Sequence, residues 1–549
     1  MKLLKSLGLS MAVLGAISSA ALAANFAKEQ VLKVGNGTEP RELDPGRATG
    51  SPEGKILDNL FEGLVNLDNN TLEVTPGVAE SWSISKDGLT YTFNIRKNAK
   101  WSDGKKLTAH DFVYSWARAL SPALASEYAY QLHYIKNGAE FTSGKVKDVK
   151  KLGVKAKDDH TLVVTLNNPT AFFLKLTAFR TLYPVPKHVI EKHKDAEWTK
   201  EGNMVSNGPF KLTEWKINKH VIAVKNPNYW DVKNVVLDRV EFFPIEKVET
   251  EENAFFSNQI HMTNEVPTVK IPLYKRRAAK NPSAYHPFRS PLFLGTYYYR
   301  FNTTKKPFND PRVRRALAMT IDRTLITERV SRAGEQPAVS FTPPGTGGYT
   351  YKGAKLNATV TPEVVAKAKA LLKEAGYADI SKFPKADILY NTSENHKKIA
   401  VAIQQMWKKN LGIQVGLFNQ EWKVYLNNQK SMNYEISRAG WIGDYADPNT
   451  FLDMWVTDGG NNQTGWSNKT YDSLIAEAAK ETEDAKRYEI FEKAESILME
   501  ELPVLPIYTY TNKKLISERV IIKDGKGGWK PWEGNIQDRI NFKNYALAK

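Results

Sequence analysis

Few residues in this sequence have the types and spacing that catalysis requires. Residues 83–86 (SISK) match the S-x-x-K pattern of a serine nucleophile with a lysine, but a D-G pair follows and predicts a turn. His188 and His193 are five positions apart, which misaligns them for one helix face and for a shared metal ion. Residues 345–348 (GTGG) have no predicted helix after them, so they indicate a turn, not a phosphate-binding loop. We therefore expect a protein that is not an enzyme, with no catalytic residue, metal site or cofactor.

One carboxylate offers a different chemistry, the binding of a cation. Asp444 follows a predicted strand at residues 435–438, within the segment WIGDY. A ligand ammonium that becomes buried needs a paired carboxylate, because an unpaired buried charge costs several kcal/mol. From the residues alone, Asp444 fits either a ligand-binding carboxylate or an ordinary loop residue.

Strands and helices alternate along the chain, which indicates an α/β protein. The clearest unit has an apolar strand at 386–390, a helix at 395–409 and a second strand at 413–418. Strands joined in this way are normally parallel, and open α/β sheets bind ligands at the carboxyl ends of their strands. We therefore expect binding residues just after the first of these strands and in the loop that carries Asp444.

Local signals predict where several helices begin. Residues 55–64 carry apolar side chains on one helical face and predict a helix. Thr108 and Asp111 form the pattern of a capping box, in which each side chain bonds to the other residue's backbone N–H. Asp310 precedes a proline, the usual pair at a helix N-cap and first helical position.

Composition limits the class of protein. The chain has 549 residues, of which 42% are hydrophobic and 25% charged, and one core rarely grows past ~250–300 residues, so we expect several folded domains. It has no cysteine, which excludes disulfides, thiol catalysis and cysteine-bound metal centres. The net charge is +17, but the basic residues are scattered, so we expect no nucleic-acid binding.

The N-terminus has the three parts of a secretory signal. Lys2 and Lys5 make it positive, residues 7–17 are mostly apolar, and residues 21–23 (ALA) form a small-x-small cleavage site. The apolar stretch is too short to span a bilayer, and no later stretch reaches ~18 apolar residues. We expect a mature periplasmic protein that starts near Ala24; a retained anchor helix is the alternative.

A series of short motifs gives the sequence a family resemblance. They are residues 60–64 (LFEGL), 76–82 (PGVAESW), 101–104 (WSDG), 107–112 (LTAHDF), 207–210 (NGPF), 307–310 (PFND) and 438–441 (RAGW). In this order and spacing they resemble the motifs of the periplasmic oligopeptide-binding (OppA-like) proteins, which form part of solute-binding protein family 5 of peptide ABC importers. The resemblance covers essentially the whole mature chain.

The resemblance implies a type II-like (cluster C) periplasmic binding fold of the α/β class. Two lobes close about a hinge, and an additional third domain extends one lobe. The implied division is a signal peptide at 1–23, domain I at 24–61, 187–294 and 512–549, domain II at 62–186, and domain III at 295–511.

The resemblance also assigns binding roles to single positions. Asp444 matches the residue that takes a peptide's α-amino group, and Arg438 matches a basic group available to a short peptide's carboxylate. The other matched positions are a pocket tyrosine, Tyr128, two polar residues, Asn391 and His396, two aromatic walls, Trp422 and Trp441, and two tyrosines within runs of tyrosine, Tyr298 and Tyr510. For each aromatic, plain core packing is the alternative. An extended peptide would then bind through its main chain, as in strand addition, with wet side-chain pockets that tolerate many sequences.

Six positions depart from the pattern of close relatives. Gly295 and Ile442 replace a disulfide pair, Gln429 and Ser331 replace basic residues, and Thr49 and Arg300 replace acidic residues. An arginine binds carboxylates through a two-pronged fork. If Arg300 points into the cleft, it supplies a carboxylate-binding site at a new place; the alternative is that it points to solvent. We therefore expect capture of the amine to be kept and recognition of the ligand's far end and side chains to differ.

Together these observations predict a periplasmic receptor that captures peptides by lobe closure. It would act as a monomer and deliver its ligand to the permease and ATPase subunits of an ABC importer. One alternative is a receptor for another solute, such as a murein peptide or haem. A second alternative, a secreted hydrolase, lacks any recognisable nucleophile or metal set.

Overall fold

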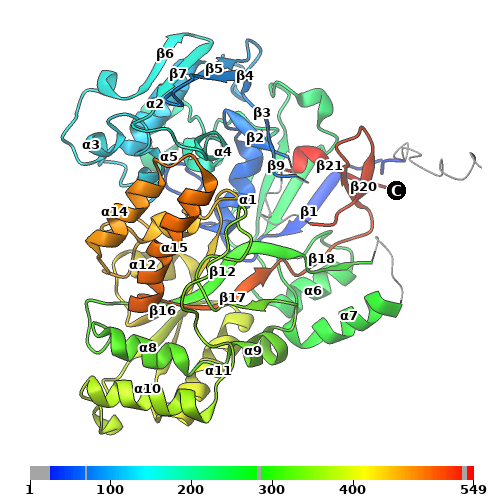
Figure 1. Ribbon diagram of the computed structural model, residues 1–549. Helices are drawn as coiled ribbons and strands as arrows, with labels where there is room; N and C mark the ends of the chain where they lie inside the picture. Colours follow the sequence, from blue (N-terminus) through cyan, green and yellow to red (C-terminus); the bar gives the residue numbers. More distant parts are fainter. Residues whose placement is uncertain (1–24, 69–70, 281–285, 535–540) are drawn as a thin grey trace, which may run out of the picture.

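The computed structural model describes residues 25–68, 71–280, 286–534 and 541–549. The expected signal peptide and the expected first mature residue, Ala24, lie outside this part. The described chain has mixed α/β structure, in which several sheets are built from strands that are distant in the sequence (Figure 1).

The largest sheet has six strands in the order β13-β17-β12-β16-β14-β15. Their bounds are Gln336–Pro337 (β13), Val504–Thr511 (β17), Leu292–Phe301 (β12), Ile436–Ile442 (β16), Asp387–Asn391 (β14) and Gly416–Gln420 (β15). Strand β12 is antiparallel to both of its neighbours, whereas β14 and β15 are parallel and joined by helix α11, Glu394–Leu411. This confirms the strand–helix–strand unit expected from the sequence.

The other sheets are smaller and mostly antiparallel. One contains β1 (Val31–Gly35), β10 (Arg239–Phe243), β9 (His220–Lys225) and β8 (Phe210–Lys216), and another contains β4 (Ala79–Ile84), β5 (Thr90–Ile95), β7 (Thr161–Thr165) and β6 (Val154–Asp158). The remaining strands are β20 (Trp529–Pro531), β19 (Val520–Lys523) and β21 (Tyr545–Leu547), and the pairs β2 (Val65–Leu67) with β3 (Val74–Pro76) and β11 (Phe288–Arg289) with β18 (Lys514–Leu515). Strand β1 pairs in parallel with β10, although the two lie far apart in the chain.

Helices lie outside these sheets and cover them (Figure 1). The longer ones are α1 (Ser51–Leu60), α2 (Ala109–Leu120), α5 (Lys187–Glu197), α6 (Val248–Phe256), α7 (Ile271–Lys280), α8 (Pro311–Met319), α10 (Pro362–Glu374), α12 (Trp422–Lys430), α14 (Lys469–Ala478) and α15 (Asp484–Glu501). The short ones are α3 (Gly138–Thr142), α4 (Phe173–Leu176), α9 (Arg323–Leu325) and α13 (Asn449–Leu452). Helix α11 packs on β14 and β15, α10 packs on α8, and α14 packs on α15.

Two helix starts agree with their sequence signals. Thr108 and Asp111 form the expected capping box at the start of α2, where the Thr108 backbone N–H donates to Asp111 Oδ2 at 2.8 Å. Asp310 caps α8 by accepting a hydrogen bond from the Arg312 backbone N–H at 2.8 Å. Both side chains satisfy backbone groups that have no partner inside the helix.

The helix expected at 55–64 is displaced towards the N-terminus. Helix α1 begins at Ser51, with a proline in its first turn, and Phe61 is already extended. The Asn207 side chain accepts a hydrogen bond from the Glu62 backbone N–H at 3.1 Å and donates one to the Glu62 carbonyl at 2.9 Å. These two bonds take the place of helical hydrogen bonds at Glu62. The expected end of the helix was therefore wrong, because Asn207, which is distant in the sequence, holds this backbone extended.

A buried ion pair holds the loop that follows β16. Arg487 of α15 donates to both carboxylate oxygens of Asp447, at 2.9 and 2.7 Å. Their side chains are only 3% and 9% exposed. A bidentate pair of this kind is costly to break, because the remaining charge is left buried without a counter-ion.

We expect Arg487→Met to lower the free energy of unfolding by about 3–5 kcal/mol, the scale for removal of one partner of a buried pair. The double variant Asp447→Asn/Arg487→Met removes both charges and should recover much of this loss. Urea unfolding followed by tryptophan fluorescence measures both values. Equal stabilities of the single and double variants would contradict the role of the pair.

Candidate functional site

Two adjoining cavities, of about 160 and about 230 Å³, lie beside β16; we call them cavity 1 and cavity 2. Both are lined by residues of α1, β12, α12 and β16, so they form one continuous cleft. Cavity 1 also contacts Tyr128 and Arg180, from the segment between residues 62 and 186. Side chains from segments that are far apart in the sequence therefore enclose this cleft.

The main feature of the cleft wall is a free strand edge. Strand β16 pairs with β12 along its whole length, but β14 pairs with it only at Ile436 and Ser437. Within the described residues, no strand pairs with this edge from Arg438 to Ile442. The sequence predicted a shorter strand, 435–438; its continued pairing with β12 extends it to two residues before Asp444.

Hydrogen bonds show which backbone groups face this edge. The Arg438 carbonyl accepts from the Tyr425 hydroxyl and from Gln429 Nε2, and both donors lie on α12. Backbone groups of an antiparallel strand point alternately to its two edges. The N–H and C=O groups of Gly440 and Ile442 therefore also point away from β12, towards the cavities that both residues line.

Asp444 lies in the loop just after β16 and lines cavity 1. Its carboxylate accepts a hydrogen bond from Gln131 Nε2 at 2.8 Å, and its backbone N–H donates to Thr450 Oγ1 at 3.0 Å. The residue is 6% exposed. Burial, followed by the negative charge of Asp444, raises the pKa of the Asp453 carboxyl well above its usual value. The Asp444 carboxylate is the group at this end of the cleft that suits a ligand cation.

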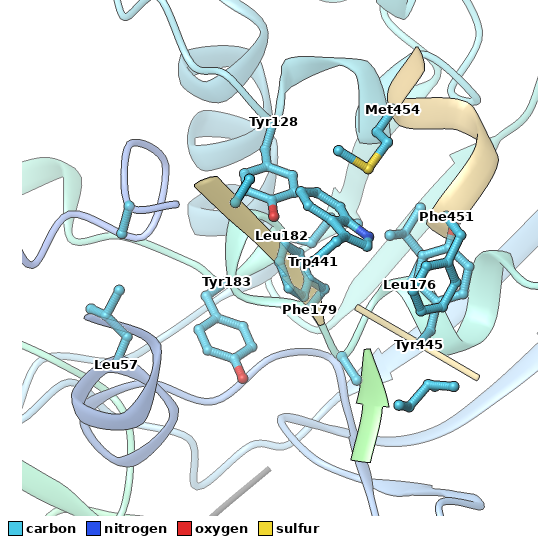
Figure 2. Close-up of a cluster of buried hydrophobic side chains, with 14 of the residues drawn as sticks. Leu57, Tyr128, Leu176, Phe179, Leu182, Tyr183, Trp441, Tyr445, Phe451 and Met454 are labelled. Atoms are coloured by element: carbon cyan, nitrogen blue, oxygen red, sulfur yellow. The ribbon is translucent and has the colours of Figure 1, made fainter. Parts of the chain in front are cut away.

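An aromatic cluster surrounds this end of the cleft. Figure 2 shows the Trp441 ring beside those of Tyr128 and Phe179. The Tyr128 ring is stacked on Trp441 with centroids 5.9 Å apart, and lies 5.1 Å from the Phe179 ring. The Trp441 indole N–H donates to the Thr450 carbonyl at 2.6 Å. All three rings line cavity 1 while also packing in the core. Tyr128 and Trp441 therefore combine the two interpretations that the sequence left open, a pocket wall and core packing.

Arg438 is a buried cation whose described partners are all neutral. Its guanidinium donates to Asn391 Oδ1 at 3.1 Å and to the Tyr510 hydroxyl at 2.7 Å, and lies 4.6 Å from the centre of the Tyr297 ring. Arg438 Nε is buried without a hydrogen-bond partner. Among the residues described, no carboxylate forms an ion pair with it. Arg438 lines both cavities, and Asn391 and Tyr510 line cavity 2, so this part of the cleft suits an anion.

His396 also lines cavity 2, beside Arg438. Its Nδ1 lies 3.4 Å from the Tyr297 hydroxyl. Burial lowers the pKa of the His396 imidazole well below its usual value, and the charges of Arg438 and Lys513 lower it further. The ring is therefore neutral near pH 7 and offers a hydrogen bond rather than a charge.

Trp422 lies where the two cavities meet and connects two distant helices. It begins α12, its ring is stacked on Tyr425, and its indole N–H donates to Glu53 Oε1 of α1 at 3.1 Å. Burial raises the pKa of the Glu53 carboxyl. Trp422 thus forms a wall of the cleft and a contact across it.

Arg300 points into the protein, so the solvent-facing alternative was wrong. It is 6% exposed and lines cavity 1. Its guanidinium donates to Gln463 Oε1 at 2.5 Å and to the Tyr298 hydroxyl at 2.9 Å. Tyr298 lines neither cavity; it packs against Phe341 and Trp455 and holds Arg300 from behind.

The other departures from the relatives' pattern have different surroundings. Gly295 and Ile442 are register partners on β12 and β16, and the Ile442 side chain fills the space next to Gly295. Thr49 and Gln429 line cavity 1. Ser331 lines neither cavity, and its hydroxyl donates to Glu335 at 3.0 Å.

Three polar residues of the cleft carried no sequence signal. Gln131 bonds to Asp444, Arg180 lies 3.5 Å from Asp58 in cavity 1, and Lys513 pairs with Glu335 at 3.1 Å beside cavity 2. They belong to segments without a recognisable binding motif, and only the tertiary fold brings them to the cleft.

Two features are absent from the described residues. These residues contain no group of three or more histidine, aspartate or glutamate side chains placed to hold a metal ion. No helix among them has the length and apolar character needed to cross a membrane.

Comparison with known proteins gives one consistent family. Residues 73–463 match the family model for bacterial extracellular solute-binding proteins, family 5. The chain is 41% identical over 540 residues to the periplasmic oligopeptide-binding protein OppA of Salmonella typhimurium, covering 95% of this chain and 94% of the relative.

Solved structures show the same relationship. The Escherichia coli murein tripeptide binding protein MppA is 40% identical and has a TM-score of 0.89, with 96% of this chain and all of that chain covered. Haemophilus influenzae OppA, in complex with the peptide RPPGFSPFR, is 35% identical with a TM-score of 0.88, over 95% of this chain and all of that chain. The unliganded open form of MppA gives only 0.64 at the same 40% identity, over 96% of this chain and 99% of that chain. The arrangement of this chain is therefore not that of the open form.

Glu251 of α6 is an ionisable group in the wall of cavity 2. Its carboxylate accepts hydrogen bonds from the backbone N–H groups of Asn264 at 2.7 Å and Glu265 at 3.2 Å. Burial raises the pKa of the Glu251 carboxyl to about 7; the charge of Glu265 acts in the same direction, and Lys55 and the two backbone bonds act against it.

This pKa predicts a pH-dependent stability. Because the folded-state pKa lies above the ordinary value of 4.5, the contribution of Glu251 is full below about pH 4 and is lost as the pH rises through about 7. We expect Glu251→Gln to gain stability relative to the wild type between pH 4 and 8, by up to about 3 kcal/mol. Urea unfolding at four pH values measures the difference, with Glu249→Gln, an exposed position on the same helix, as control. A difference that does not change with pH would contradict the assignment.

Proposed function

Because this chain belongs to family 5 of the bacterial extracellular solute-binding proteins, we propose that its cleft captures peptides and delivers them to the permease of an ABC importer. The peptide main chain pairs with the free edge of β16. The α-ammonium group binds Asp444, and a carboxylate of a short peptide binds Arg438.

One observation carries this proposal: a free strand edge inside an enclosed cleft, with a carboxylate at one end and an arginine further along it. An extended peptide has the complementary pattern. Its N–H and C=O groups alternate along its edge, and its two ends carry opposite charges. Recognition of the main chain fixes the register of the ligand without reading its sequence.

The contacts across the cleft support capture by closure. Gln131 bonds to Asp444, and Trp422 bonds to Glu53, so distant segments meet around the ligand site. The higher similarity to the MppA structure than to its open form supports the same view. A ligand that touches both sides stabilises the closed arrangement by its differential affinity for it.

The rest of the proposal follows from the family. The protein is a monomeric, non-enzymatic receptor of the periplasm, exported by the signal peptide at 1–23 with a mature start near Ala24. It works with permease and ATPase subunits. Its hinged lobes follow the division expected from the sequence: domain I at 24–61, 187–294 and 512–549, domain II at 62–186, and domain III at 295–511.

A murein peptide is a second candidate ligand. The E. coli protein MppA, named as a murein tripeptide binding protein, has a TM-score of 0.89 with this chain. A murein peptide also offers a free amine to Asp444. No observation among the described residues favours haem or a hydrolytic reaction.

Removal of the Asp444 charge tests the proposed function. We expect Asp444→Asn to weaken the binding of tripeptides with a free amino terminus by about 2–4 kcal/mol, because their ammonium group is then buried without a counter-ion. N-acetylated tripeptides should bind poorly to the wild type. Titration calorimetry after removal of endogenous ligand measures both effects.

Asp458→Asn is the matched control, since Asp458 is exposed and lines neither cavity. It should bind like the wild type. Equal affinity of the wild type for acetylated and free peptides would show that Asp444 does not take the amine.

A further inference from the structure

Arg300 lacks a negative partner within the described chain. Its guanidinium bonds to the neutral side chains of Gln463, Tyr298 and Tyr434, and its Nε is buried without a hydrogen-bond partner among the described residues. No ion pair connects it to a described carboxylate. An arginine is charged at every physiological pH, and a buried charge without a counter-ion is costly. A buried guanidinium without a negative partner, in the wall of a cavity, can bind an anion that comes from outside the chain.

Other charged side chains of cavity 1 have partners within the chain. Lys55 Nζ donates to Asn264 Oδ1, and Arg180 lies beside Asp58 at 3.5 Å. Glu127 lies beside Lys430 at 3.5 Å and accepts from Gln463 Nε2 at 2.9 Å.

Arg300 and Arg438 are thus two cations of the wall that have only neutral hydrogen-bond partners among the described residues. With the ammonium group at Asp444, as in the proposed function, the complementary ligand has one ammonium group and two carboxylates.

The position of Arg300 indicates which carboxylate it takes. Arg300 and Asp444 line cavity 1 and not cavity 2, whereas Arg438 lines both. Along β16, however, Arg300 is the register partner of Ser437, one position beyond Arg438 as counted from Asp444. A peptide that pairs with β16 and has its amine at Asp444 therefore reaches Arg300 with a side chain beyond its first residue.

Closure completes this subsite. Gln463 accepts from Arg300 and donates to Glu127, which lies in the segment proposed as domain II. The same amide thus orients the guanidinium and connects it to the opposite side of the cleft.

We propose that the cleft selects short acidic peptides, in which an acidic side chain beyond the first residue binds Arg300. The proposal rests on the peptide-binding function and names the ligand class. Selectivity arises because a neutral side chain leaves the guanidinium unpaired, whereas a carboxylate accepts its two-pronged donors.

A matched peptide series tests this subsite. The probes are trialanine and its variants with one Glu or one Gln at each position, titrated into the wild type, Arg300→Gln and Arg300→Lys. In the wild type, Glu at position 2 or 3 should bind about 10- to 100-fold more tightly than Gln at that position. Arg300→Gln should reduce this preference to within about 3-fold, and Arg300→Lys should keep part of it, because an ammonium group preserves the charge but not the fork.

Controls distinguish a failure of this inference from a failure of the proposed peptide-binding function. Urea unfolding shows whether Arg300→Gln is folded, and the affinity of each protein for trialanine is the reference against which its Glu and Gln peptides are compared. Arg312→Gln, at an exposed position of α8 that lines neither cavity, should keep the full preference. Equal binding of Glu and Gln peptides to the wild type overturns the inference and leaves the peptide function standing. A Glu preference that survives in Arg300→Gln overturns it too. If no peptide of the series binds the wild type, the proposed function itself fails.

Discussion

Desolvation of polar groups inside the cleft is the constraint on which the site depends. The edge of β16 from Arg438 to Ile442, the two guanidiniums of Arg300 and Arg438, and the carboxylate of Asp444 all lie in a wall closed by both sides of the molecule. Each buried polar group without a partner costs about 1–3 kcal/mol, and a charged one costs more. An extended peptide with an acidic side chain supplies main-chain partners for the strand edge and carboxylates for both guanidiniums at once. The same groups that make an empty closed cleft unfavourable therefore make ligand binding and closure a single event.

The packing around the cleft serves to place these groups. Strand β12, in the middle of the largest sheet, pairs with one edge of β16. Two of its tyrosines contact the arginines of the cleft: the Tyr298 hydroxyl accepts a hydrogen bond from Arg300, and the Tyr297 ring lies against Arg438. On the other side, α12 occupies the Arg438 carbonyl, which leaves the next backbone groups to the ligand. The buried pair of Arg487 and Asp447 fixes the loop that presents Asp444. A rigid wall of this kind reduces the entropy lost when the ligand binds.

Much of the local structure could be predicted from the sequence, because it depends on neighbouring residues. The capping box at Thr108, the N-cap at Asp310 and the parallel strands around α11 follow from spacing and propensity. The end of α1 could not be predicted, since Asn207, far away in sequence, holds Glu62 extended.

The residues of the candidate site also fall into those that the sequence predicts and those that it does not. Asp444 could be predicted as a binding residue because it is a carboxylate that follows a strand. Nine of the ten expected site residues line the two cavities. Tyr298 does not, because its ring turns into the core while only its hydroxyl reaches Arg300. Gln131, Arg180 and Gln463 reach the cleft only by tertiary packing, and no local pattern marks them. The direction of Arg300 stayed open in the sequence for the same reason: a residue on a strand buried on both sides has no exposed face to distinguish.

The most direct test of the central claim is a crystal structure of the protein with a bound tripeptide that has a free amino terminus. The account predicts an extended ligand whose main chain hydrogen-bonds to the N–H and C=O groups of Gly440 and Ile442, with its ammonium group within hydrogen-bond distance of the Asp444 carboxylate. A ligand bound elsewhere, or bound in the cleft without pairing to β16, would contradict it.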